Sequence, residues 1–211
     1  MEQKYMNHNN DTVEIEINRS RFISHIERTE TEKEAKAFIS RIKKEHSSAN
    51  HNCSAYIVGK SALIQKADDD GEPTGTAGVP ILEVLKREEL YNVTVVVTRY
   101  FGGIKLGAGG LIRAYSSSAS AAVKEAGKVF EIDMHPVTVT LDYTFTSKFE
   151  HYLNTADITA QNIDYTDKVT YHLLVKTEDI DALKSVLQET TKNTFNFIQD
   201  DPVQAESVLK S

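Results

Sequence analysis

Residues 93–126 read VTVVVTRYFGGIKLGAGGLIRAYSSSASAAVKEA, and this stretch is the most informative part of the chain because it joins a strand, two glycine pairs and a small-residue helix without interruption. Its opening run, VTVVVT, is β-branched and predicts a strand that is covered on both faces. A helical pattern begins at about Leu111. Between them lie five glycines, which tolerate positive φ and allow close backbone approach. These glycines are Gly102, Gly103, Gly107, Gly109 and Gly110. We therefore expect a buried strand that turns sharply into a helix.

Residues 99–113, which we call the glycine corner, are cationic. No Asp or Glu occurs between Leu90 and Lys124, whereas Arg99, Lys105 and Arg113 fall within this interval. The free N–H groups and positive dipole end of a helix start favour an anion, and aromatic side chains can stack on bases. We expect the three cations to share one exposed face. The candidate nucleic-acid or partner contacts are Arg99, Tyr100, Phe101, Gly102, Gly103, Lys105, Gly107, Gly109, Gly110 and Arg113.

Two other interpretations of the glycine corner stay open. The first is that the glycines serve only to pack strand against helix, because GGIKLGAGG matches neither GxGxxG nor GxxxxGK[ST]. The second is that the corner is a protein-binding surface.

The polar run at residues 68–78, which we call the acidic loop, is predicted to support this corner. Its supporting residues are Asp69, Asp70, Gly71, Glu72, Pro73 and Thr74. Clustered carboxylates suit Mg²⁺ or Ca²⁺, but DGEP also makes a good turn, and we assign no metal or cofactor. We expect the acids to pair with Arg99 or Arg113 and hold the loop against the glycine corner.

No residue is assigned a catalytic role. His51 and Cys53 are two apart on a predicted strand and share a face, but a nucleophile also needs a general base and an oxyanion pocket. A single cysteine with scattered histidines does not make a zinc site, and we expect a buried thiol. The serines of AYSSSASAAV lack a GxSxG elbow.

Composition indicates a cytoplasmic protein. The apolar runs are far shorter than the roughly 18 residues of a membrane span, the start MEQKYMNHNND lacks the apolar segment of a signal peptide, and one cysteine makes no intrachain disulfide. The formal net charge of −7 argues against indiscriminate nucleic-acid binding. Residues 1–136 carry 18 basic and 19 acidic side chains, a net of −1, and residues 137–211 carry 6 and 12, a net of −6.

The periodicity predicts an α+β chain of two domains, residues 1–136 and 137–211. Strands are expected at 13–17, 21–27 and 53–59, with a capping box at Thr31 and Glu34 before a helix and a short helix from Pro80. The second domain reads as strand 137–145, helix 147–154, strands 158–164 and 168–176, helix 178–190 and strand 194–199. This βαββαβ order is ferredoxin-like. The tail after Pro202 is expected to be loose.

Four blocks of the sequence together resemble the Impact/YigZ family. They are SRFISHI (20–26), HNCSAYIVG (51–59), DDDGEPTGTAGVPIL (68–82) and VVVTRYFGGIKLGAGGLIRAY (95–115). The resemblance covers most of residues 13–126, and the whole length resembles the two-domain bacterial members. It implies an Impact N-terminal domain of the ribosomal protein S5 domain 2 type, similar to domain IV of elongation factor G, and a second domain similar to domain V of that factor. No catalytic residue set is implied.

The resemblance also implies a role associated with translation, since the eukaryotic members bind proteins of the amino-acid-starvation kinase pathway. We expect a non-enzymatic regulatory protein that binds RNA, the ribosome or a translation-associated protein. The alternative is a hydrolase that acts on a phosphate-bearing or peptide substrate in a cleft between residues 68–78 and 100–110.

Overall fold

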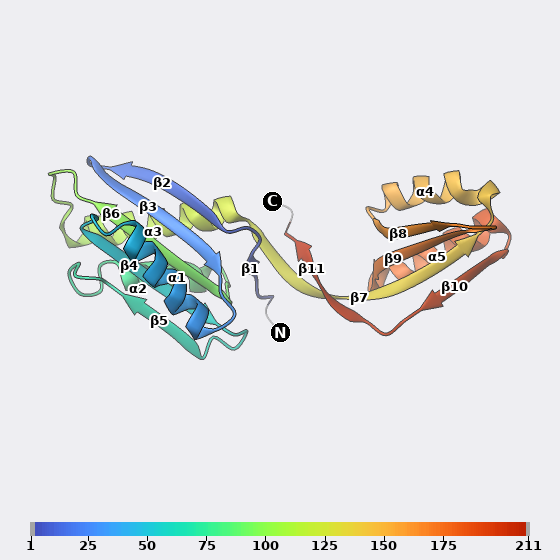
Figure 1. Cartoon of the computed structure of the whole chain (residues 1–211), viewed down its shortest axis with the longest axis horizontal. Helices are drawn as coiled ribbons and strands as arrows, with labels where there is room; N and C mark the ends of the chain where they lie inside the picture. The colour runs from blue at the N-terminus through green and yellow to red at the C-terminus, as the bar shows by residue number, and fades with distance from the viewer. Residues whose placement is uncertain (1–2, 210–211) are drawn as a thin grey trace. The chain divides into compact units, whose positions relative to one another are not determined.

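The computed structural model describes residues 3–209, and the predicted α+β class is confirmed. The chain divides into two compact units (Figure 1). Among the described residues, the first unit comprises 3–130 with 208–209, and the second is Glu131–Ser207. The elements of the first unit are β1 (Met6–Asn7), β2 (Asp11–Ile17), β3 (Ser20–Arg28), α1 (Glu32–Glu45), β4 (His51–Val58), β5 (Ile64–Asp68), α2 (Gly78–Arg87), β6 (Val93–Tyr100) and α3 (Gly107–Ala126).

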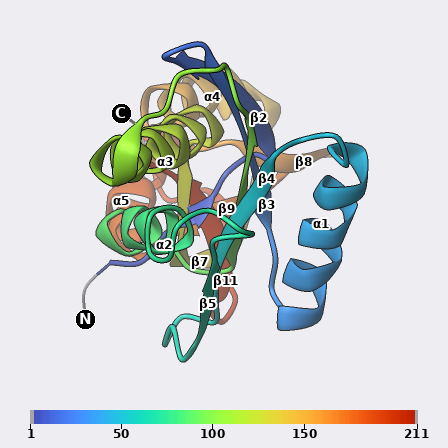
Figure 2. The same ribbon diagram turned by 90° about the vertical axis from the view of Figure 1, so that its left-hand side faces the viewer.

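The first unit is built on a five-stranded antiparallel sheet in the order β2-β3-β6-β4-β5. Helix α1 lies on one face of this sheet, and α2 and α3 lie on the other (Figure 2). Thr31 caps α1 as predicted, because its hydroxyl accepts from the Glu34 N–H at 3.2 Å. The hairpin between β2 and β3 turns at Asn18 and Arg19, both with positive φ.

The central strand β6 is covered on both faces, as its β-branched run predicts. Val93, Val95 and Val97 pack toward α2 and α3, and Val96 packs toward α1. All four side chains are fully buried. Because β6 sits in the middle of the sheet, its last residues and the turn that follows are held firmly in place.

Helix α3 begins at Gly107, four residues before the helical pattern starts at Leu111. Glycine is a poor helix former and carries no apolar side chain, so the first turn is invisible to periodicity. Tertiary contacts fix it instead, since Leu106 and Leu111 pack against the core of the first unit.

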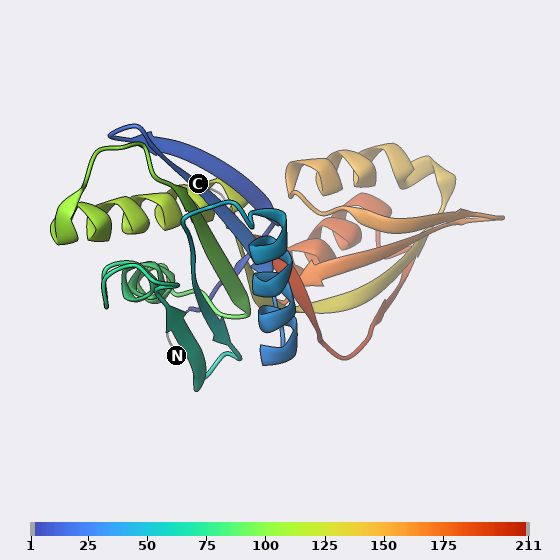
Figure 3. The same cartoon turned by 60° about the vertical axis from the view of Figure 1, so that its left-hand side comes forward.

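The second unit has the predicted ferredoxin-like order. Its elements are β7 (Lys128–Leu141, which begins in the first unit), the 3₁₀ turn η1 (Tyr143–Phe145), α4 (Thr146–Thr155), β8 (Ala160–Tyr165), β9 (Val169–Lys176), the 3₁₀ turn η2 (Thr177–Asp179), α5 (Ile180–Thr191), β10 (Phe195–Gln199) and β11 (Val203–Val208). The antiparallel sheet runs β10-β7-β9-β8. Helices α4 and α5 share one core with the alternate buried residues of β7 and β9 (Figure 3).

The structure differs from expectation around β7. This strand runs without a break through Pro136, where the sequence places the end of the first domain. Residues 134–141 pair continuously with β9, and the Pro136 carbonyl also accepts from the Asp200 N–H at 3.0 Å. The tail after Pro202 is not loose: β11 pairs with β7, and the Leu209 N–H donates to the Lys128 carbonyl at 2.9 Å. A largely exposed strand such as VQAESV carries little apolar alternation, so the sequence does not reveal it.

Candidate functional site

The glycine corner is anchored from both sides where β6 ends. The Phe101 N–H donates to the Asn50 side-chain oxygen at 2.8 Å, and the Gly102 N–H donates to the Ser20 hydroxyl at 3.2 Å. A Cβ on Gly102 would lie 1.9 Å from the Arg19 carbonyl oxygen. Glycine is required here because the backbone passes directly over the β2–β3 turn.

Arg99 is not part of an exposed face, so the expectation for this residue is wrong. It is only 6% exposed, and its Nη1 lies 2.7 Å from Oε1 of Glu72, which is 8% exposed. The rings of Phe22 and Phe101 flank its guanidinium, each 5.5 Å away. The physical reason is that the acidic loop folds over the end of β6 and supplies the counter-charge. The predicted pairing of this loop with Arg99 is confirmed through Glu72.

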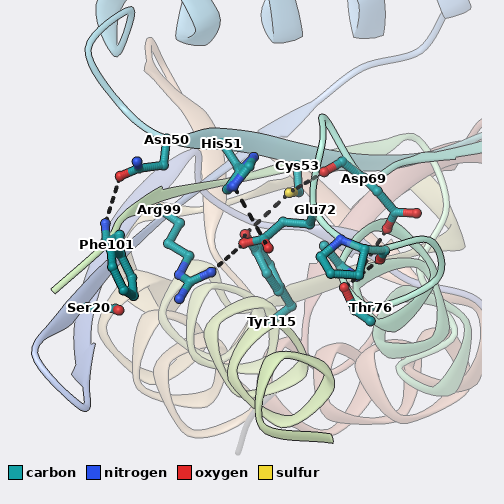
Figure 4. Close-up of polar contacts among 12 residues, drawn as sticks. Ser20, Asn50, His51, Cys53, Asp69, Glu72, Thr76, Arg99, Phe101 and Tyr115 are labelled. Atoms are coloured by element: carbon teal, nitrogen blue, oxygen red, sulfur yellow. Dashed lines mark hydrogen bonds and ion pairs between the residues drawn. The ribbon is translucent and has the colours of Figure 1, made fainter. Parts of the chain in front are cut away.

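A buried polar network extends inward from Glu72 (Figure 4). The Tyr115 hydroxyl donates to Glu72 Oε1 at 2.8 Å, and the Cys53 sulfur lies 3.3 Å from that hydroxyl and 3.0 Å from the Asp69 carbonyl oxygen. Burial raises the pKa of the Cys53 thiol and the pKa of the Tyr115 hydroxyl. Both groups therefore stay protonated, and Cys53 is the buried thiol that was expected.

His51 lies at the mouth of this network and not against the thiol. Its Nδ1 is 2.9 Å from the Asp70 carbonyl oxygen, and its Nε2 is 3.9 Å from Glu72 Oε2. Within residues 3–209 no hydrogen bond joins His51 to Cys53. A carbonyl oxygen can only accept, so Nδ1 carries a hydrogen and donates it to Asp70, and Nε2 lies on the Glu72 side of the ring.

The acidic side chains of the loop turn to different partners. Asp69 accepts from the N–H groups of Gly75, Ala77 and Gly78 at 2.8, 3.1 and 2.8 Å, at the start of α2. Burial raises the pKa of Asp69, but these three donors lower it more, and the net shift is downward. Asp70 accepts from the Asn52 N–H at 2.6 Å and pairs with a lysine of α1.

The geometry does not favour a metal site in the acidic loop, because each carboxylate of the loop has a protein partner. Asp69 accepts from backbone N–H groups, Asp68 and Asp70 pair with Lys43, and Glu72 pairs with Arg99. No group of three or more His, Cys, Asp or Glu side chains within residues 3–209 is arranged to hold a metal ion. Gly71 adopts a positive φ beside the His51 ring, the Pro73 carbonyl accepts from the Thr76 hydroxyl at 2.6 Å, and Thr74 is exposed.

A pocket of about 390 Å³ opens in front of the first turn of α3. Glu72 and Arg99 lie at its base, and Phe101, Lys105 and Gly107 line its rim. The first turn of α3 contains no acidic residue and has no side-chain cap. The Arg99 Nε is buried and has no hydrogen-bond partner among the residues that the structure describes. The pocket thus presents unused N–H donors and a cation to whatever enters it.

The other predicted contacts fall into two sets. Lys105, Gly103, Gly107 and Gly109 are exposed at the corner, Gly110 is partly exposed there, and Arg113 is exposed one turn further along α3. Tyr100 points to the opposite face of the sheet, where its hydroxyl bonds His46 Nδ1 at 2.9 Å, so it does not join the pocket. Sequence reasoning missed Asn50, which lines the pocket from the loop before β4. A lone polar loop residue carries no periodic signal.

Known proteins resemble this chain in both of its parts. The model described as the Impact N-terminal domain matches residues 18–123, and the one described as domain of unknown function DUF1949 matches residues 139–194. "IMPACT family member YvyE" of Bacillus subtilis is 48% identical over 84% of this chain and 82% of its own length. "IMPACT family member YigZ" of Escherichia coli is 31% identical over 89% of this chain and 93% of its own.

Two further matches are a eukaryotic protein and a solved structure. "Protein IMPACT" of Homo sapiens is 35% identical over 45% of this chain and 31% of its own length. A solved structure titled "Crystal structure of an hypothetical protein" is 30% identical, with a TM-score of 0.59, and covers 94% of this chain and 97% of that one. Among residues 3–209, no helix is long and apolar enough to cross a membrane.

Proposed function

The chain belongs to the Impact family, and from that premise we propose that it is a translation-associated regulatory protein that binds ribosomal or other RNA in the cytoplasm without catalysing a reaction. The observation that carries this proposal is the pocket at the start of α3. There the buried Arg99 lies beside Lys105 and the start of α3. Among the described residues, the Arg99 Nε has no hydrogen-bond partner and α3 has no side-chain cap. This combination suits a phosphate group.

The expected number of phosphate contacts is small. Glu72 neutralises part of the charge of Arg99, which leaves Lys105, Arg113 and the N–H groups of α3 as the main contacts. Residues 137–211 carry a net charge of −6 and add repulsion. Contact with roughly two to four phosphates gives modest affinity and a slope of log K against log salt of about −1.5 to −4.

The absence of catalysis is supported by the protonation of the buried network. A thiolate or phenolate nucleophile would need a lowered pKa, and burial raises the pKa of both Cys53 and Tyr115. The network instead ties the acidic loop to α3 and gives the pocket a fixed shape.

One observation favours the alternative, a hydrolase. His51 lines the pocket, and its Nδ1–H donates to the Asp70 carbonyl at 2.9 Å, which fixes the ring as an orienting group does for a general base. Turnover of a generic phosphate ester or peptide by the purified protein, lost in His51→Gln, would replace the binding proposal with this one.

The test is a salt titration of binding to a single-stranded RNA, with Lys105→Ala compared with Lys33→Ala. Lys33 is exposed on α1 and lies outside the corner. We expect Lys105→Ala to flatten the slope by about 0.7 to 0.9, one phosphate's share, and Lys33→Ala to leave it unchanged. If the wild-type protein binds no RNA at about 50 mM salt, the corner contacts a protein partner instead.

A further inference from the structure

A second basic site lies on the other face of the first unit's sheet. Helix α1 packs over β4 and β6 through two small cores, and the edge strand β5 lies beyond it. Figure 2 shows α1 on its own side of the sheet, opposite α2 and α3. The groove between α1 and β5 has a volume of about 420 Å³. We call it the lysine groove.

Lysines converge on this groove from both of its walls. Lys36, Lys43 and Lys44 are seven and eight residues apart on α1, which places them on one helical face. Lys66 comes from β5, where it lies opposite Tyr56 in the register and so shares the α1 face of the sheet. Asp68 is the one carboxylate in the lining among the described residues.

The ion pairs leave part of this charge uncompensated. Lys43 pairs with Asp70 and Asp68 at 2.7 and 3.3 Å, and Lys36 pairs with Glu32 at 2.9 Å. Within residues 3–209, neither Lys44 nor Lys66 forms an ion pair. Glu32 also interacts electrostatically with Lys66. The four lysines still outnumber the three carboxylates around them, which are Glu32, Asp68 and Asp70, so the groove keeps an excess of positive charge that a negatively charged ligand complements.

The remainder of the lining is apolar with a few hydroxyls. Ile39, Tyr56 and Ala67 line the groove between the lysines, and Ser40 and Ser54 add hydrogen-bonding groups. The volume lies within the roughly 300–1,000 Å³ of small-molecule sites and suits one compact ligand better than a flat macromolecular surface. Lysine is a common point-charge ligand for phosphate.

We propose that the lysine groove binds a nucleotide, with its phosphates on Lys44 and Lys66 and its base against Ile39. The ligand is either a free nucleotide or one nucleotide of a single-stranded RNA. This site does not depend on RNA binding at the glycine corner, because that pocket is lined from the α3 side of the sheet.

The experiment is an ¹⁵N NMR titration of the full chain with ADP, adenosine and an eight-nucleotide oligo(A). We expect ADP to shift the amide signals of α1 and β5, and adenosine alone to bind at least about tenfold more weakly. The double variant Lys44→Ala/Lys66→Ala is expected to weaken ADP binding by at least about tenfold, and Lys33→Ala to leave it unchanged. A free nucleotide is the ligand if ADP binds as tightly as oligo(A), and an RNA chain is the ligand if oligo(A) binds more tightly through the same two lysines.

Three results would overturn the proposal. The first is no shift in α1 or β5 with either ADP or oligo(A) at low salt. The second is ADP binding that survives the double variant. The third is displacement of ADP by a poly-glutamate peptide at equal concentration, which would assign the groove to an acidic protein. Lys105→Ala separates the two sites, because it should alter RNA binding at the corner and leave the ADP shifts intact.

Discussion

Arg99 Nη1 donates to Glu72 Oε1 across 2.7 Å, and both side chains are buried. This ion pair joins the end of the central strand β6 to the acidic loop. The Tyr115 hydroxyl of α3 donates to the same Glu72 carboxylate, so the loop is also bonded to α3. Arg99 and Glu72 at the base of the pocket therefore hold β6, the acidic loop and α3 together. We expect this ion pair to fix the position of the residues that line the pocket.

Removing one partner of this pair should be costly. Arg99→Met leaves the Glu72 carboxylate buried without its cation, and we expect the free energy of unfolding to fall by about 3–5 kcal/mol. Glu72→Gln leaves the guanidinium uncompensated and should cost a similar amount. The double variant should lose less than the sum of the two single variants, because it leaves no unpaired charge. Urea denaturation measures all three, and strict additivity would contradict this account.

Two adjacent glycines should respond very differently to alanine. A Cβ on Gly102 meets the Arg19 carbonyl at 1.9 Å, whereas Gly103 has nothing within 4 Å of the same position. Gly102→Ala should cost at least about 2 kcal/mol, since the turn has to move. Gly103→Ala should cost only about 1 kcal/mol, from its positive φ of 85°. Equal losses of unfolding free energy for the two variants, in thermal or urea unfolding, would show that Gly102 is not in tight contact with the β2–β3 turn.

The carboxylate of Asp69 should stabilise the start of α2. It accepts three backbone N–H groups, and Asp69→Ala leaves all three without that acceptor, at a cost of about 2–4 kcal/mol. The matched control is Asp68→Ala, whose side chain is 46% exposed and which should cost less than about 1 kcal/mol. Urea unfolding compares the two, and a similar loss for both would mean that the cap contributes nothing specific.

Most helices and strands were predictable because each shows its own periodicity of apolar residues along the sequence. The β-branched run of β6 predicts a strand that is buried on both faces. The alternation of apolar and polar residues in β7 and β9 predicts strands that are buried on one face, which together with the helical segments gives the ferredoxin-like order of the second unit. The start of α3 at Gly107 and the strand β11 depend on contacts with distant residues, so no local pattern announces them.

The exposure of the predicted site residues could not be read from the sequence. Two cations of the acid-free interval, Arg99 and Lys105, line the pocket, but Arg99 is buried because the acidic loop folds over it. The lysine groove was missed for a related reason. Lys44 and Lys66 are far apart in the sequence, and only the packing of α1 beside an edge strand brings them together.

The last prediction concerns His25, whose ring is 8% exposed and packs 5.0 Å from the His46 ring. Burial first, and the neighbouring His46 second, lower the pKa of His25 from 6.5 to about 4. Between these two values the unfolded chain binds the proton and the folded chain does not. This contribution to stability is therefore full above about pH 6.5 and is lost as the pH falls toward 4.

We expect the free energy of unfolding to fall by about 2 kcal/mol over this window, less than the full pKa shift implies because the ring is partly screened. His25→Gln should remove this component from urea unfolding measured at about pH 7 and about pH 4.5, and the exposed His8→Gln should not. An unchanged pH dependence in His25→Gln would mean that folding does not lower the pKa of His25.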